Sequence, residues 1–138
     1  MADVFTPAKR SAIMARIKGE NTQPEILVRK IIHSLGYRFR LHKKTLLGKP
    51  DIVLPRHEKV IFVHGCFWHG HPGCVRSALP ATRKKFWRNK ISGNVARDIR
   101  VRRSLIRQGW RVLVVWQCQT KNPARLSNRL EQFLRGTR

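Results

Sequence analysis

Cysteine and histidine side chains that could bind a metal ion are concentrated in one short stretch of the chain. Cys66, His71 and Cys74 form the pattern C-x4-H-x2-C, and Cys118 follows a later apolar run. Three thiolates and one imidazole are a common ligand set of closed, tetrahedral zinc sites. Reduced cysteines also pack readily in hydrophobic cores, but Cys66 and Cys74 lie among glycine, proline and histidine residues, where core packing explains them poorly. The pattern therefore predicts a structural zinc ion that fixes this loop to the end of a sheet.

A second possible metal site involves Asp51, one of only 7 acidic residues in the chain. Asp51 opens a short apolar run, and Val63 lies on the strand that is predicted to return beside it. In such a hairpin the Asp51 carboxylate and the backbone carbonyl of Val63 can face one hard cation. Mg2+ prefers oxygen ligands and retains several waters, so these two groups and DNA phosphate oxygens would suffice to bind it.

Two histidines in the same stretch, His64 and His69, are not needed for zinc. A histidine with a pKa near neutrality can deprotonate a water molecule that attacks phosphorus, although a phosphate or backbone hydrogen bond explains either residue equally well. Gly70 permits an irregular loop in which His69 and His71 serve different sites. The remaining histidines have no obvious partners and are interpreted as surface residues: His33, His42 and His57.

Glu25 has two possible roles. Thr22 and Glu25 have the spacing of a capping box at a helix start, which accounts for the carboxylate fully. A carboxylate at a helix N-terminus can also orient a metal-bound water molecule, and the spacing alone leaves both roles open.

Aromatic residues accompany the polar ligands. Phe67 and Trp68 lie in the metal-ligand loop, and Phe86 and Trp87 lie in a basic segment. Aromatic rings among cations can stack on bases while the cations neutralise phosphates, at about 1–3 kcal/mol per stacked base. Apolar side chains inserted between base steps also kink a duplex. The alternative for Phe86 and Trp87 is that one of the two faces the core.

The net charge indicates the class of partner. The 138 residues carry 30 Lys and Arg against 7 Asp and Glu, a formal charge of +23. Such a charge repels itself, and a nucleic acid that releases counterions is the usual reason to tolerate it. A membrane partner is disfavoured, because the chain has no run of about 18 apolar residues. Three cysteines, without a signal-like N-terminus, favour a reducing compartment and argue against a disulfide framework.

The hydrophobic pattern predicts the elements that must position these residues. Residues 1–18 are expected to form a mobile arm that contacts DNA and holds a short helix at 11–17. The expected strands are 37–41, 51–54, 60–63 and 110–116, the last with Trp110 and Trp116 in the core. The other expected helices are 22–35 closed by Gly36, 81–91, a helix capped by Asn94 that ends at Gly109, and a last helix from Asn122.

This order of elements predicts a single α/β domain over residues 1–138, long enough to bury a core without disulfides. The hairpin is expected to pair with the first strand. The strand at 110–116 is expected to enter in parallel through a helical crossover, which gives a central mixed sheet flanked by helices.

Four segments resemble a known family. GKPD at 48–51, FVHGCFWH at 62–69, PATRKKFW at 80–87 and GWRVLVVWQC at 109–118 are similar to the very-short-patch (Vsr) mismatch repair endonucleases of the restriction-endonuclease-like superfamily. The resemblance covers nearly the whole chain. Val63 stands where the family often has Thr, and the loop between His71 and Cys74 is one residue longer.

The resemblance implies a Mg2+-dependent nick in one strand, 5′ to the thymine of a T:G mismatch left by deamination of 5-methylcytosine. It implies Mg2+ on Asp51 and the Val63 carbonyl, His69 as the base, assistance from His64 and Glu25, and zinc on Cys66, His71, Cys74 and Cys118. It also implies that Phe67, Trp68 and Trp87 wedge into the duplex and that Met14, Lys90 and Asn94 approach the mispair.

The expected partners are double-stranded DNA with a mismatch, a cytosine-5 DNA methyltransferase system and mismatch-repair proteins. A monomer in the bacterial cytoplasm, associated with the nucleoid through DNA, is expected. The competing hypothesis is a non-catalytic, zinc-stabilised basic protein that binds DNA or RNA, for which the Asp51 carboxylate would have no use. An HNH-type nuclease is disfavoured, because no histidine follows His71 to supply the later metal ligand.

Overall fold

A mixed four-stranded sheet forms the centre of the protein, which a computed structural model describes over residues 21–136. The predicted N-terminal arm, its helix at 11–17 and Met14 lie outside these residues. The sheet order is β1-β2-β3-β4, in which β1/β2 and β2/β3 are antiparallel and β3/β4 is parallel. The strands are β1 (Arg40–Leu41), β2 (Ile52–Leu54), β3 (Lys59–His64) and β4 (Arg111–Trp116). The predicted α/β class and mixed sheet are confirmed.

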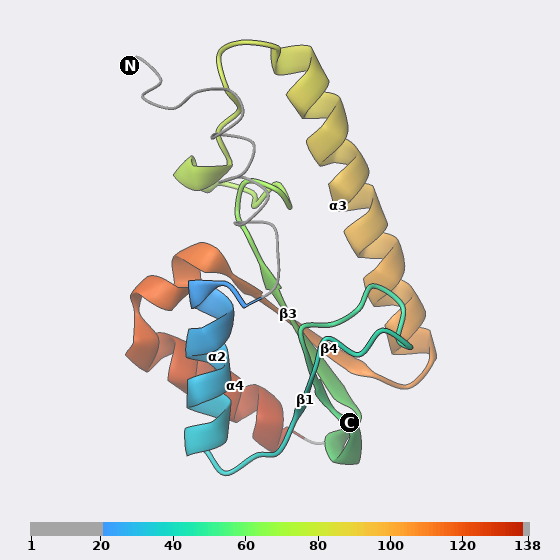
Figure 1. The fold of residues 1–138 in the computed structure, drawn as a ribbon, viewed down its shortest axis with the longest axis vertical. Coiled ribbons are helices and arrows are strands. Elements are labelled where there is room, and N and C mark those ends of the chain that lie inside the picture. The colour runs from blue at the N-terminus through green and yellow to red at the C-terminus, as the bar shows by residue number, and fades with distance from the viewer. Residues whose placement is uncertain (1–20, 137–138) are drawn as a thin grey trace.

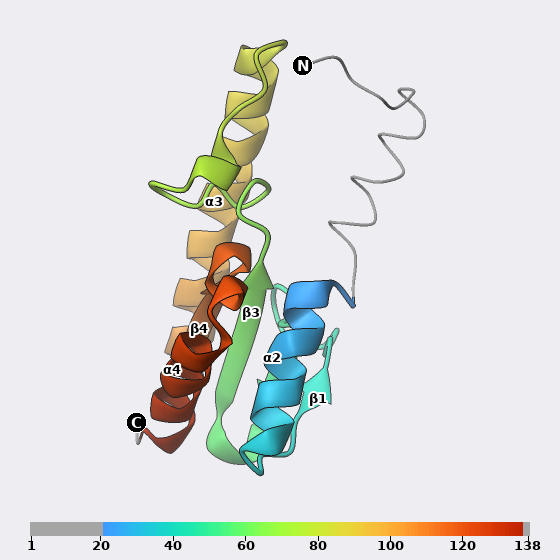
Figure 2. The same cartoon turned by 90° about the vertical axis from the view of Figure 1, so that its left-hand side faces the viewer.

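Within residues 21–136, α-helices cover both faces of the sheet (Figure 1). Helices α2 and α4 lie together against one face, and α3 covers the other and extends beyond the end of the strands (Figures 1 and 2). Short 3-10 turns connect these elements: η1 (Pro55–His57), η2 (Val75–Ser77) and η3 (Gln117–Lys121). The α-helices are α2 (Gln23–Ser34), α3 (Lys84–Arg107) and α4 (Pro123–Arg135).

Two hydrophobic clusters hold the layers together, one on each face of the sheet. In β3, Ile61 faces the α2/α4 side while Val60 and Phe62 face α3, because successive side chains of a strand point in opposite directions. A strand covered on both faces reads as a continuous apolar run, as this one does. The cluster on the α2/α4 side includes Val28, Ile32, Ile52, Leu126, Leu130 and Leu134, and the other includes Val53, Val101 and Leu105.

The start of α2 confirms the predicted capping box. The Thr22 hydroxyl accepts the Glu25 N–H at 3.4 Å, and the Glu25 carboxylate accepts the Thr22 N–H at 3.2 Å. Gly36 follows the helix with a φ of +89°, the left-handed conformation that commonly ends helices.

The two helices predicted around Asn94 are a single helix, α3, so the expected cap at Asn94 is wrong. Gly93 has no positive φ and remains helical, at a cost of about 1 kcal/mol relative to alanine. Burial of Ile91 on one side of it and of Val101 and Leu105 on the other keeps the helix continuous. The Asn94 side chain instead donates its amide N–H to the Trp68 carbonyl at 2.9 Å.

Other boundaries differ from prediction in smaller ways. The first strand is reduced to Arg40–Leu41, while Tyr37 and Phe39 pack against the α2/α4 cluster without strand pairing. Trp110 is partly buried and packs against the cluster on the α3 side, which agrees with its predicted core position. Trp116 is also partly buried, at the end of the sheet, and belongs to neither hydrophobic cluster. Within residues 21–136, none of the helices is apolar and long enough to cross a membrane.

Candidate active site and metal centre

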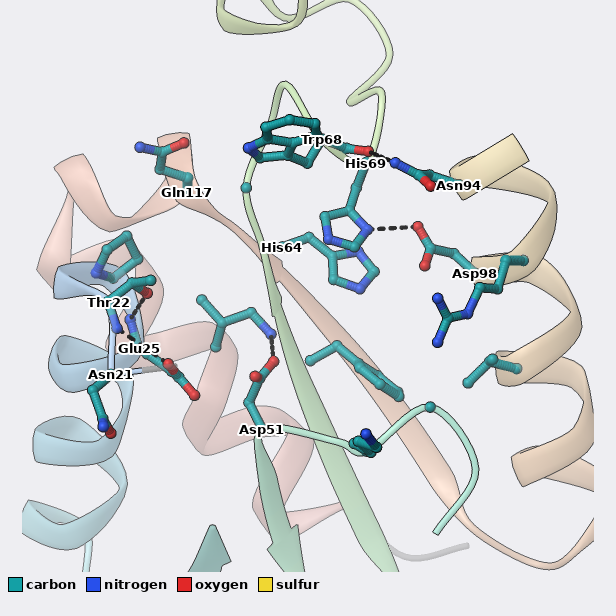
Figure 3. Close-up of a pocket in the computed structure, with 18 of the residues that line it drawn as sticks. Asn21, Thr22, Glu25, Asp51, His64, Trp68, His69, Asn94, Asp98 and Gln117 are labelled. Carbon is teal, nitrogen blue, oxygen red and sulfur yellow. Dashed lines mark hydrogen bonds and ion pairs between the residues drawn. The ribbon is translucent and has the colours of Figure 1, made fainter. Parts of the chain in front are cut away.

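A cleft of about 760 Å3 opens where the sheet, the start of α2 and the middle of α3 meet (Figure 3). Glu25 reaches it from α2 and Asp51 from the start of β2. His64 and His69 enter from the end of β3 and the loop after it, and Asp98 enters from α3. The cleft therefore collects all four residues for which the sequence predicted catalytic roles: Glu25, Asp51, His64 and His69.

On one side of the cleft is a carboxylate cluster, which consists of Glu25, His42 and Asp51. Their ligand atoms lie within 4.8 Å of one another. The Asp51 carboxylate accepts the backbone N–H of Val63 at 2.7 Å, because the antiparallel register of β2 and β3 brings these positions side by side. Asp51 and Val63 are therefore neighbours, as the predicted hairpin requires. The contact between them is made by the Val63 N–H, whereas the sequence analysis assigned the Val63 carbonyl to the cation.

The two carboxyl groups of this cluster have opposite pKa shifts. Burial raises the pKa of Asp51 to about 7, and the negative charge of Glu25 adds to the rise, against the hydrogen bond from Val63. Burial also acts to raise the pKa of Glu25, but hydrogen bonds from His42 and Asp51 outweigh it, so that this pKa lies below its ordinary value. Asp51 is therefore the more readily protonated of the two carboxyl groups, and a divalent cation can replace that proton. The oxygen-rich donor set suits Mg2+.

The interpretation of His42 as a surface residue is wrong. Its Nε2 lies 2.5 Å from Oε1 of Glu25, and its side chain is only 15% exposed. No local pattern indicates this contact, because His42 and Glu25 come from different elements and meet only through the tertiary fold.

A histidine cluster of His64, His69 and Asp98 occupies the other side of the cleft (Figure 3), with ligand atoms within 4.8 Å of one another. The His69 Nδ1 lies 2.7 Å from the Asp98 carboxylate. The ring of His64 stacks on that of His69, and its own Nδ1 is buried without a hydrogen-bond partner among the described residues. Burial, followed by the neighbouring charge of His69, lowers the pKa of His64 to about 4. His64 is therefore neutral at physiological pH.

Asp98 is a second site residue, in addition to His42, that was not predicted from the sequence. It is one of only 7 acidic residues and lies in the arginine-rich segment that forms α3. That scarcity was the available indication, since an isolated carboxylate among cations on a polyanion-binding protein needs a specific partner. The distance in sequence between Asp98 and His69 hid which partner it was.

The four predicted zinc ligands come together at the end of the sheet, and we call them the cysteine cluster. Ligand atoms of Cys66, His71, Cys74 and Cys118 lie within 4.8 Å of one another. The Cys118 N–H donates to Sγ of Cys66 at 3.4 Å, and Cys118 Sγ lies 3.5 Å from His71 Nδ1. Burial raises the pKa of the Cys66 thiol to about 11, and no disulfide links the three cysteines. Three converging thiols and an imidazole fit a tetrahedral zinc ion, which would keep the thiolates charged.

Gly70 allows His69 and His71 to point to different clusters. Its φ is +58°, and a Cβ atom at this position would lie 2.8 Å from a methyl group of Ile91. Glycine is therefore required both by the backbone conformation and by the close approach of α3.

Three aromatic rings pack edge to face at the rim of the cleft, which Trp68 lines: Phe67, Trp68 and Trp87, with centroids 5.3 to 5.9 Å apart. Trp68 is buried among them, while Phe67 is only partly buried. Phe86 is exposed, and the Arg83 guanidinium lies 4.3 Å from its ring centroid. Because Trp87 contacts Phe67 and Trp68, it faces the loop that follows β3. Lys90, on the same helix, is exposed.

Comparison with known proteins identifies the family. The family model described as DNA mismatch endonuclease Vsr matches residues 2–76. The chain is 49% identical over 134 residues to the type II nicking enzyme V.XorIIP of Xanthomonas oryzae, covering 97% of this chain and 98% of the relative. It is 40% identical over 141 residues to the DNA mismatch endonuclease Vsr of Escherichia coli, covering 99% and 90%. The chain belongs to the Vsr family.

A third relative, the type II nicking enzyme V.NmeAIP of Neisseria meningitidis, is 44% identical over 98% of this chain and 96% of its own length. The resemblance predicted from sequence motifs is confirmed, and the Vsr family is one of nucleases, as expected. The family match at 2–76 contains the carboxylate cluster, both cleft histidines and three of the four residues in the cysteine cluster.

Proposed function

We propose that this protein is a single-domain, restriction-endonuclease-like enzyme that nicks mismatched double-stranded DNA. The proposed cleavage is 5′ to the thymine of a T:G mismatch, depends on Mg2+, and serves very-short-patch repair of deaminated 5-methylcytosine. The observation that carries the proposal is the placement of the Glu25–Asp51 pair and the His69–Asp98 pair on opposite sides of one cleft.

The carboxylate side supplies the cation site. Asp51, the Val63 carbonyl and Glu25 would hold Mg2+, with Glu25 able to act through a bound water. When bound, the ion neutralises phosphate charge and favours ionisation of the attacking water. Asp51 is poised for this role because its pKa near 7 lets a divalent cation displace its proton.

The histidine side supplies the base. Because Nδ1 of His69 contacts Asp98, the tautomer with a proton on Nδ1 is favoured and Nε2 is available to accept a proton. In the proposed reaction His69 removes a proton from water as the new oxygen–phosphorus bond forms and the ester bond to the leaving strand breaks. Asp98 stabilises the resulting imidazolium, and His64 supports the ring by stacking.

The remaining predicted residues would bind DNA or hold the loop. Phe67, Trp68 and Trp87 are proposed to separate base steps at the mismatch, for which the buried Trp68 would have to leave its aromatic neighbours. Zinc on the cysteine cluster would fix the loop. Met14, Lys90 and Asn94 are proposed to lie near the mispair, although Asn94 also holds the Trp68 carbonyl.

The proposed setting follows from the substrate. T:G mismatches of this origin require a cytosine-5 methyltransferase in the same cell, and mismatch-repair proteins would act on the same lesions. We propose that the enzyme works as a monomer on nucleoid DNA in the bacterial cytoplasm.

Substitution of Asp51 tests this proposal. Asp51→Ala is expected to abolish Mg2+-dependent nicking of an end-labelled duplex with one T:G mismatch, while DNA binding at the same salt concentration persists. The matched T:A duplex is the substrate control, and Glu131→Gln, a partly exposed carboxylate in α4 that lies outside the cleft, is the protein control. Unchanged nicking by Asp51→Ala would refute the assignment. Absence of nicking by every variant and by the wild type would favour a non-catalytic nucleic-acid-binding protein.

A further inference from the structure

His42 connects the two elements that carry the catalytic carboxylates. It follows β1 directly, with a φ of +44°. Its backbone N–H donates to the carbonyl of Asp51 at 3.2 Å, while its imidazole reaches Glu25 on α2. A single residue therefore contacts the strand side through its main chain and the helix side through its side chain.

The Glu25 carboxylate is held from several directions. Oε2 accepts the Thr22 N–H at 3.2 Å, and Oε1 lies 3.4 Å from the Arg29 guanidinium and 2.5 Å from the His42 Nε2. Thr22 and Arg29 belong to the cap of α2 and to α2 itself, so they move with the helix. His42 comes from the sheet side and sets where the carboxylate lies relative to Asp51.

Arg29 is a weaker constraint than His42. Its contact with Glu25 is longer, and the same guanidinium nitrogen lies 2.8 Å from the Asn21 side chain. Without the His42 side chain, Oε1 of Glu25 would keep, among the described residues, the contact with Arg29, which Arg29 shares with Asn21. It would also still face the carboxyl group of Asp51. Because like-charged carboxylates repel when both are ionised, Glu25 would then turn away from Asp51.

We propose that His42 is a positioning residue of the catalytic cation site, whose Nε2–H holds Glu25 toward Asp51 so that both carboxylates face one divalent cation. This inference rests on the proposed function. Histidine–carboxylate pairs around metal ligands orient those ligands, and loss of such a partner typically costs about 10- to 100-fold in metal affinity or activity. The required feature is the N–H donor, so an amide at this position can replace the imidazole.

Two substitutions separate this role from others. His42→Gln keeps an N–H donor, whereas His42→Leu keeps bulk and removes the donor. Mn2+ binding to each variant, bound to a nicked T:G duplex, is measured by electron paramagnetic resonance, and the Mg2+ dependence of single-turnover nicking is measured in parallel. His42→Leu is expected to raise the Kd for Mn2+ and the half-saturating Mg2+ concentration by about 10-fold or more. His42→Gln is expected to stay within about threefold of wild type, and His33→Leu, an exposed histidine of α2, is the control.

Each outcome decides the proposal. Wild-type metal affinity in His42→Leu overturns it. A defect in His42→Gln equal to that in His42→Leu also overturns it, because the donor alone would then be insufficient. If His42→Leu does not fold, pulsed electron paramagnetic resonance of wild-type protein with Mn2+ replaces it. An imidazole-nitrogen coupling to Mn2+ that is present in wild type and lost in His42→Gln would overturn a positioning role. Spectra without such a difference support one. If Asp51→Ala nicks normally, the proposed function fails instead.

Discussion

The imidazole rings of His64 and His69 are stacked face to face, with centroids 3.8 Å apart and planes at 4°. Two rings at this distance cannot both carry a positive charge without strong repulsion. Burial and the neighbouring ring lower the pKa of His64 to about 4, so His64 remains neutral. In the proposed mechanism, the proton taken from the attacking water therefore goes to His69, which has Asp98 beside it.

The first prediction concerns Asp98. Asp98→Asn retains size but removes the charge that stabilises protonated His69 and that favours its Nδ1–H tautomer. The single-turnover nicking rate should fall by about 100-fold or more, since replacing the aspartate that orients a catalytic histidine by asparagine can cost up to about 10,000-fold. The measurement is a rapid-quench time course on a T:G duplex at saturating enzyme.

Glu131→Gln serves as the matched control, since this carboxylate pairs only with Arg135 on the exposed side of α4 among the contacts described. DNA affinity of Asp98→Asn should stay close to wild type. A variant with normal single-turnover chemistry and weakened DNA affinity would instead show that Asp98 has a structural or DNA-binding role.

The comparison of sequence with structure shows where local patterns are sufficient. Strands with continuous apolar runs, such as Val60–Val63, and the capping box of Thr22 and Glu25 are determined by neighbouring residues and were predictable. The cysteine cluster was predictable from residue types, because few other roles explain cysteine in such a loop. The single helix α3 was not predictable, because the Ser92–Gly93–Asn94 interruption is overridden by burial of Ile91, Val101 and Leu105.

His42 and Asp98 were missed for a different reason. Each acquires its partner only when separate elements pack together, β1 against α2 for His42 and α3 against the loop after β3 for Asp98. His42 lies 17 residues from Glu25 in the sequence, and Asp98 lies 29 residues from His69. No helix or strand periodicity relates residues that far apart. Residues that complete a site through tertiary contact are therefore the part of a site that a single sequence conceals most effectively.

The second prediction concerns removal of metal from the cysteine cluster. Cys118→Ser, or wild type treated with a zinc chelator, should lower the melting temperature by more than about 5 °C, which corresponds to about 1 kcal/mol in a domain of this size. The nicking rate should fall as well, because His71 stacks on Trp116 at 4.2 Å and Trp116 contacts the ring of His64 at 5.3 Å.

Calorimetry of purified protein, with zinc measured on the same sample, tests this prediction. Zinc added back to the chelated wild type should restore both melting temperature and activity, while Cys118→Ser should not recover. A fully folded, zinc-free wild type with an unchanged melting temperature would exclude a structural zinc ion.

The third prediction concerns pH and stability without added divalent cation. The pKa of Asp51 is raised by burial to about 7, above that of an unfolded aspartate. The folded state therefore binds more protons than the unfolded state between about pH 4 and 7, and the free energy of unfolding should decrease as pH rises through this window. Urea titrations at several pH values measure the effect, which is at most about 1.4 kcal/mol per pH unit.

Asp51→Asn isolates the contribution of this one group. The variant should lose the component of the pH dependence that falls between about pH 4 and 7, and added Mg2+ should stabilise the wild type more than the variant at pH 7.5. Identical pH profiles for the two proteins would mean that Asp51 titrates near its ordinary value.

The last prediction concerns Lys59, a nearly buried lysine at the end of β3 opposite to His64. Its ammonium group donates to the carbonyls of Leu134 and Gly136 at 2.7 and 2.6 Å and so neutralises the C-terminal end of α4. Lys59→Met keeps the length of the side chain but leaves these carbonyls without their charged donor. The free energy of unfolding should fall by about 1–3 kcal/mol, as measured by urea denaturation. Lys121→Met, at an exposed position, should unfold at the wild-type midpoint. Because Lys59 lies away from the cleft, nicking by the folded variant should be normal, and a loss of activity without a loss of stability would contradict this account.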